Sequence, residues 1–109
     1  MSAEARIAPR KAIRCRAKIV LDDKISLDAR TVDISSSGIC MILAEQLPAG
    51  RACLIAFDIP INGKMRKIRA VAKAVYSICS GTEGFRVGFQ FVQVDAATTM
   101  TITELTRDA

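Results

Sequence analysis

The sequence of 109 residues contains no histidine and no tryptophan, and its aromatic residues are four phenylalanines and one tyrosine. Without histidine, neither a Ser-His-Asp nor a Cys-His catalytic arrangement can form. The glycine-rich phosphate loops Gly-x-Gly-x-x-Gly and Gly-x-x-x-x-Gly-Lys-Ser are also absent. No pair of carboxylates recurs in a pattern that suggests a catalytic cleft. We therefore expect a protein that binds rather than an enzyme.

Cysteine is present, but not in a pattern that binds metal. The four cysteines are widely spaced and include no Cys-x-x-Cys pair, and no histidine is available to complete a zinc site. Each cysteine falls inside an apolar or alternating segment, so we expect buried thiols in a reducing compartment rather than disulfides. We expect no metal and no cofactor. The cysteines are Cys15, Cys40, Cys53 and Cys79.

Long apolar runs are missing as well. None approaches the roughly 20 residues that a membrane span needs. The first six residues lack the apolar core of a signal peptide, so we expect a cytoplasmic protein. The length suits one domain. We expect a flexible N-terminal arm over residues 1–9 and a single folded domain over residues 10–109.

Positive charge is concentrated at the N-terminal end. Residues 1–18 hold six basic residues and one acidic residue, whereas residues 19–109 hold ten of each, so the whole excess of +5 lies in the first segment. A surface that serves only solubility would be expected to spread its charge. A basic arm of this kind indicates an anionic partner.

The hydrophobic pattern is mainly that of β-strands. Residues 14–19 alternate between charged and apolar, and Asn62-Gly63 is typical of a two-residue hairpin turn. A slip of phase near Arg30-Thr31 suggests a bulge. Asp95 is a candidate N-cap for a short helix over residues 96–106. The pattern indicates a mainly all-β fold, an antiparallel barrel or sandwich with a C-terminal helix. The six expected strands are 14–19, 25–34, 39–44, 51–59, 65–78 and 85–91.

A short polar segment, Asp33-Ile-Ser-Ser-Ser-Gly38, separates two of these strands. Asp and Ser bond to nearby backbone amides, and glycine accepts a positive φ and the close approach of other groups. Three hydroxyls and a carboxylate exceed what a turn needs, so the segment is a candidate ligand cradle. The pattern Asp-x-Ser-x-x-Gly would arise by chance in roughly one such chain in forty.

This segment is part of a resemblance to a known family. Together with Arg10-Lys-Ala-Ile-Arg14 and Arg86-Val-Gly-Phe-Gln-Phe91, it resembles a PilZ domain over about residues 9–95. The resemblance implies a six-stranded antiparallel β-barrel and a bacterial receptor for cyclic di-GMP. By the same resemblance, the binding residues are Arg10, Arg14, Asp33, Ser35 and Gly38, with Arg6, Lys11, Ser36 and Arg86 as possible additions. Gly88 and Phe91 match the family's closing strand and are expected to be structural.

The chemistry of the ligand agrees with this assignment. Guanidinium groups bind phosphate oxygens or the guanine O6/N7 edge in a forked geometry, and they stack on purine rings. Asp33 can accept from the guanine N1–H and N2–H groups, or orient an arginine. We expect the N-terminal arm to be disordered before Arg14 and to fold over the barrel when the dinucleotide binds. The reordered surface would then meet a downstream protein partner.

Two other functions remain open from the sequence. The basic arm would also suit a nucleic-acid-binding barrel, but such proteins use exposed aromatic platforms. Three phenylalanines lie on the inward phase of the last strand, which leaves Phe57 and Tyr76. The other alternative is a PilZ-like module that docks on a protein without any ligand. The sequence does not determine the oligomeric state.

Overall fold

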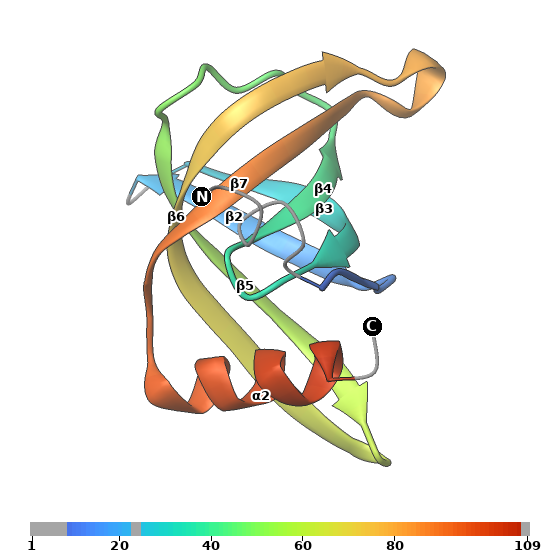
Figure 1. The fold of residues 1–109 in the computed structure, drawn as a ribbon. Helices are drawn as coiled ribbons and strands as arrows, with labels where there is room; N and C mark the ends of the chain where they lie inside the picture. The colour runs from blue at the N-terminus through green and yellow to red at the C-terminus, as the bar shows by residue number, and fades with distance from the viewer. Residues whose placement is uncertain (1–8, 23–24, 108–109) are drawn as a thin grey trace.

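The computed structural model describes residues 9–22 and 25–107 (Figure 1). The expected flexible arm over residues 1–9 therefore lies outside the described residues, except for the exposed Pro9.

The described residues form seven β-strands and one α-helix. All six predicted strands are present, and a short additional strand precedes them. A single 3-10 turn, η1 (Gly81–Glu83), lies between the last two strands. The strands and the helix are β1 (Lys11–Ala12), β2 (Arg16–Asp22), β3 (Ile25–Ile34), β4 (Gly38–Leu43), β5 (Ala52–Ile61), β6 (Lys64–Cys79), β7 (Phe85–Val94) and α2 (Ala96–Thr106).

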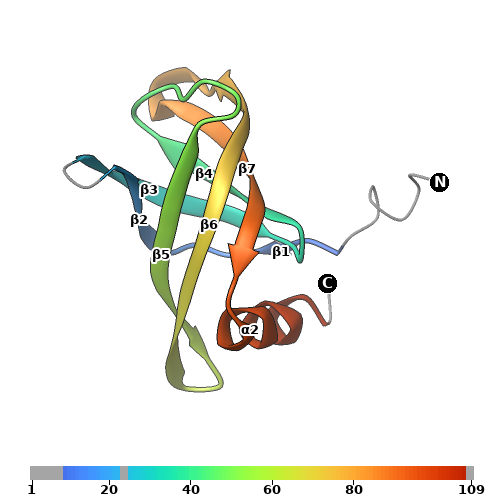
Figure 2. The ribbon, with the colours of Figure 1, turned by 90° about the vertical axis from the view of Figure 1, so that its left-hand side faces the viewer.

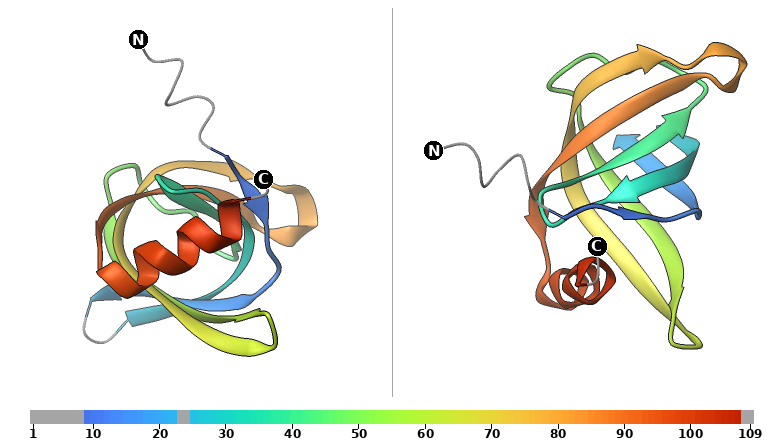
Figure 3. Two further views of the ribbon diagram at one scale, coloured as in Figure 1. Left: turned by 60° about the horizontal axis from the view of Figure 1, so that its bottom comes forward. Right: turned by 45° about the vertical axis from the view of Figure 1, so that its right-hand side comes forward.

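Six of the strands close into an antiparallel ring, which confirms the predicted barrel. The order is β3-β2-β5-β6-β7-β4, and the pairing of β4 with β3 closes the ring. β1 pairs with β3 beyond the end of β2. Seen along the ring, α2 lies across one end (Figure 3, left). Because the sheet closes on itself, most strands have partners on both sides, and few backbone groups are left at an open edge.

The core lies inside the ring. Alternate residues of β2, β5 and β6 point inward, as shown by the fully buried Ile19, Ile55 and Ile68. β4 is buried along its whole length, as its unbroken apolar sequence predicts. The predicted bulge is also present, because the pairing of β3 with β4 shifts by one residue between Thr31 and Asp33.

The predicted hairpin turn at Asn62-Gly63 and the predicted helix N-cap at Asp95 are both confirmed. Asn62 and Gly63 have φ values of 52° and 81°, as a type I′ hairpin requires. The Asp95 carboxylate accepts a hydrogen bond from the Thr98 amide at 2.7 Å, and this bond lowers the pKa of Asp95. The helix packs on the barrel through the buried Ile102. Of the helices in the part of the chain that the structure describes, none has the length and apolarity needed to cross a membrane.

Gly38 has a different role from the one expected at the end of a turn. Its φ is not in the positive region, unlike that of Gly50, Gly63, Gly81 and Gly84. A Cβ at residue 38 would instead lie 2.1 Å from the carbonyl oxygen of Phe89. Glycine is needed here because β4 begins directly against the backbone of β7, at the point where the ring closes.

Replacing Gly38 by alanine should therefore destabilise the barrel. The added methyl group meets rigid backbone rather than a movable side chain, so we expect a loss of about 1–3 kcal/mol in the free energy of unfolding. Denaturant unfolding of Gly38→Ala measures it. Ser36→Ala, at an exposed position of the same turn, is the control and should unfold like the wild type. Equal stability of the two variants would show that β4 can move away from β7 at little cost.

Candidate functional site

The basic arm lies along β3 and continues the line of β2. Lys11 and Ala12 pair with Ile34 and Asp33, so the arm takes the place beside β3 that β2 leaves vacant. The Ile13 side chain is buried in the core. Figure 2 shows the segment from β1 to β2 running alongside β3. The expectation of disorder before Arg14 is therefore wrong for residues 10–13, and residues 1–8 lie outside the described part of the chain.

The arm brings the first arginine of the arginine pair to the polar turn. A guanidinium nitrogen of Arg10 lies 2.6 Å from a carboxylate oxygen of Asp33. The Arg10 side chain is 56% exposed and that of Asp33 is 26% exposed. An ion pair this exposed contributes only about 0–1 kcal/mol to stability. Its significance is geometric, because two motifs separated by 23 positions meet at one place on the surface.

The polar turn itself is organised by Ser35. This residue is fully buried, and its hydroxyl oxygen accepts from the amides of Ser37 and Gly38 at 3.2 and 3.3 Å. Its own amide donates to the Gly38 carbonyl at 2.8 Å. The Ser35 hydroxyl therefore shapes the turn from inside, whereas Ser36 is exposed at its tip.

An aromatic side chain lies beside this turn. Across the sheet, Asp33 is opposite Cys40, Cys40 is opposite Gly88, and Gly88 is opposite Tyr76. A Cβ at residue 88 would lie 2.1 Å from the Tyr76 ring, so the ring rests on the bare backbone of Gly88. This close packing gives Gly88 a structural role. Tyr76 remains 42% exposed and presents one ring face at the site.

Cys40 and Tyr76, which lie in one row across the sheet with Asp33, stay protonated near neutral pH. Burial raises the pKa of Tyr76 and is the largest cause of its shift. Burial likewise raises the pKa of the Cys40 thiol. The Tyr76 hydroxyl lies 3.8 Å from the Cys40 sulfur, toward which it donates. The row therefore offers a neutral aromatic surface and no further negative charge beyond Asp33.

A groove of about 490 Å³ continues from the arm toward β7. Arg14 and Arg86 line it together, so the second motif arginine and the arginine of the closing strand face the same space. Arg16 and Arg30 also line it, and Glu83 is the one acidic residue in its wall. The groove is thus strongly cationic.

Lys11, Arg6 and the four cysteines were also the subject of predictions. Lys11 is exposed on β1, and Arg6 lies outside the described residues. The four cysteines are free, but only Cys40 and Cys53 are buried, and Cys79 is exposed against expectation. Within residues 9–22 and 25–107, no three His, Cys, Asp or Glu side chains are placed to hold a metal ion.

The sequence pattern did not indicate three residues of the site, namely Tyr76, Arg30 and Thr31. The first two are placed by strand register, and the pairing of β6 with β7 shifts between Ala74 and Tyr76. Without that shift Tyr76 would not lie opposite Gly88. The phase slip near Arg30-Thr31 is visible in the sequence, but the sequence does not show which side chains the bulge places at the site.

Thr31 holds the arm at the point where β1 ends. Its hydroxyl donates to the Ile13 carbonyl at 3.0 Å and accepts from the Cys15 amide at 2.8 Å. Its own amide donates to the Cys15 carbonyl at 2.9 Å. The side chain is only 4% exposed, so water cannot readily replace these bonds.

Thr31→Val should loosen the arm without changing the shape of the side chain. Two backbone groups lose their partner, which costs about 1–3 kcal/mol, and amide exchange at residues 11–15 should accelerate more than exchange in β5 and β6. Hydrogen exchange followed by NMR or mass spectrometry measures this. Thr31→Ser keeps the hydroxyl and should restore slow exchange. If Thr31→Val exchanged like the wild type in the arm, the hydroxyl would not be what holds it.

Solved structures of other proteins share this fold, and three of them are compared with this chain. Bacillus subtilis inhibitor of motility, MotI/DgrA, matches with a TM-score of 0.77 and 16% identity over 92% of this chain and 47% of that one. The chain thus spans about half the length of that protein. The PilZ domain of Escherichia coli YcgR, solved with cyclic di-GMP, matches with a TM-score of 0.61 and 16% identity over 90% of this chain and 86% of that one.

The third structure is the PilZ domain of CeSA from a cellulose-synthesizing bacterium. It matches with a TM-score of 0.59 and 13% identity over 90% of this chain and 94% of that one. No curated protein matches the sequence. The family model of the PilZ domain matches residues 4–108. Since that range covers nearly the whole sequence, the chain belongs to the PilZ domain family.

Proposed function

We propose that this chain is a cytoplasmic receptor for cyclic di-GMP that acts on a protein partner. PilZ domains are generally receptors or adaptors for this dinucleotide. The observation that carries the proposal is the contact of Arg10 with Asp33, because it joins the arginine arm and the polar turn into one site. The YcgR PilZ domain, which has a similar fold, was solved with cyclic di-GMP and supports the choice of ligand.

The chemistry of the site suits a guanine dinucleotide. Arg10 and Arg14 supply guanidinium groups for phosphate oxygens or for a guanine edge. Asp33 supplies the acceptor for the guanine N1–H and N2–H groups. Ser35 and Gly38 contribute by holding the turn in shape, through the buried hydroxyl and the close contact with β7. Lys11, Ser36 and Arg86 are possible further contacts, and Tyr76 offers a ring face for stacking.

The proposed switch begins with an exchange of partners. A phosphate of the ligand replaces Asp33 as the partner of Arg10, and the released carboxylate turns to a guanine edge. The exchange is inexpensive because an exposed ion pair contributes little. The arm stays paired with β3, and the ligand binds against it on one face of the barrel. The arm and the ligand together form the surface that the partner recognises.

The burial of the aromatic residues argues against a nucleic-acid-binding barrel. Single-strand binders need several exposed aromatic rings. Phe57 and Phe89 are buried, whereas Tyr76 is 42% exposed. One ring suits a single stacked base rather than a strand of nucleic acid.

Calorimetry with cyclic di-GMP tests the proposal. The wild type should bind, and Arg14→Ala and Asp33→Ala should each weaken binding by roughly 10- to 100-fold, as expected for the loss of one charge-assisted contact. Arg69→Ala, at an exposed position on β6, is a matched control and should bind normally. An absence of heat with the wild type would contradict the proposal. Binding of single-stranded DNA in its place would support the nucleic-acid alternative.

A further inference from the structure

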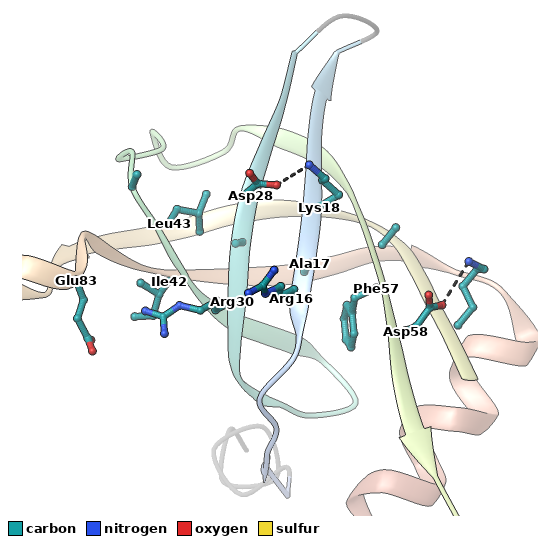
Figure 4. A pocket seen from close by; sticks show the side chains of 14 residues that line it. Arg16, Ala17, Lys18, Asp28, Arg30, Ile42, Leu43, Phe57, Asp58 and Glu83 are labelled. Atoms are coloured by element: carbon teal, nitrogen blue, oxygen red, sulfur yellow. Dashed lines mark hydrogen bonds and ion pairs between the residues drawn. The ribbon is translucent and has the colours of Figure 1, made fainter. Parts of the chain in front are cut away.

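A second set of arginines crosses the sheet one row away from Asp33. Arg16 on β2 is directly opposite Arg30 on β3, Arg30 is opposite Ile42 on β4, and Ile42 is opposite Arg86 on β7. Figure 4 shows Arg16 and Arg30 next to each other, with Ile42 to one side. We call Arg16, Arg30 and Arg86 the arginine row.

The arginine row is unfavourable for the barrel itself. Like charges directly opposite each other on antiparallel strands are destabilising. Among the described residues, no carboxylate lies within ion-pair distance of any of the three guanidinium groups. The ion pairs in that part of the chain hold other basic residues, namely Arg10, Lys18, Arg51, Arg66 and Lys67. The fold therefore places three guanidinium groups together without an ion pair to any of them, and Glu83 is the one acidic residue that lines the same groove.

The arginine row shares one groove with Arg14, the second arginine of the motif. Arg14 of the arm lines the same space of about 490 Å³ as all three arginines of the row. On β4, Cys40 lies opposite Asp33 and Ile42 opposite Arg30, two residues further along. Two residues of a strand span roughly 7 Å, so one ligand can reach from Asp33 to the arginine row.

Part of the lining of the groove is apolar, which suits a base. Ile42 is 8% exposed and lies between Arg30 and Arg86, and Ala12 and Val32 complete the apolar part of the wall. Apolar side chains with guanidinium groups around them suit a purine ring that carries a phosphate, because guanidinium groups both pair with phosphate and stack on purines. A larger hollow of about 770 Å³ nearby shares Arg16 and Arg30 but also contains Asp28 and Asp58, so it is less suited to an anion.

We propose that Arg30 and Arg86 bind the half of a cyclic di-GMP ligand that the Arg10–Asp33 end of the site does not reach, with Arg16 reinforcing the positive field. This inference rests on the proposed function. It adds Arg30 of β3 to the binding surface and gives Arg86 of β7, until now only a possible further contact, a defined role beside it. It also gives a reason why the barrel keeps two arginines directly opposite each other.

Calorimetry with cyclic di-GMP at low and high salt tests this inference on Arg30→Gln and Arg86→Gln, with Arg69→Gln as the control. Glutamine keeps most of the aliphatic stem and removes the charge. Each variant of the row should bind roughly 10- to 100-fold more weakly and with less dependence on salt, because a charged contact has been lost. Thermal unfolding of Arg30→Gln should occur at the same temperature as in the wild type or higher, since the variant removes a repulsion.

The outcomes separate the two proposals. If Arg14→Ala weakens binding while both row variants bind like the wild type, the arginine row is only solvated surface. The inference then fails, and the proposed function stands. If the wild type does not bind cyclic di-GMP at all, both fail. If the row variants lose affinity only together with a large fall in unfolding temperature, misfolding explains the loss and the inference is overturned.

Discussion

The pairing of the N-terminal arm with β3 is the interaction on which the rest of the site depends. Backbone hydrogen bonds and the buried Thr31 hydroxyl fix the arm beside the strand that leads into the polar turn. The hydrogen bonds of the buried Thr31 side chain are largely shielded from water, whereas the Arg10–Asp33 ion pair is exposed. The two kinds of contact therefore have different roles. The shielded bonds position the arm, and the exposed pair can be exchanged for a ligand at little cost.

The closed sheet makes this arrangement possible. β3 pairs with β2 over one part of its length, with β1 over another, and with β4 on its other side. A bulge at Val32 shifts the register of β3 against β4, near the point where the partner of β3 on its other side changes from β2 to β1. Gly38 and Gly88 then allow β4, β7 and the Tyr76 ring to approach closely. The site thus lies where β4, β7 and the Tyr76 ring pack closely.

Much of the fold could be predicted from the sequence because its signals are local. Alternation marks the strands, Asn62-Gly63 marks a hairpin, and Asp95 marks the start of the helix. The family resemblance assigned Arg10 and Asp33 to one site, but the two were expected to meet only when the ligand binds. The role of Gly38, the place of Tyr76 and the arginine row could not be predicted, because each depends on which residues lie opposite one another across strands. Strand β1 has only two residues, too few to show a period.

The central claim is that the arm, the polar turn and the adjoining face of β7 form one binding surface for a guanine dinucleotide. Amide chemical shifts of the labelled protein, recorded while cyclic di-GMP is added, test it most directly. The account predicts that the largest changes fall on residues 10–15, on residues 33–38 and around Gly88. Changes confined to α2 and the β5–β6 hairpin, or no changes at saturating ligand, would contradict it.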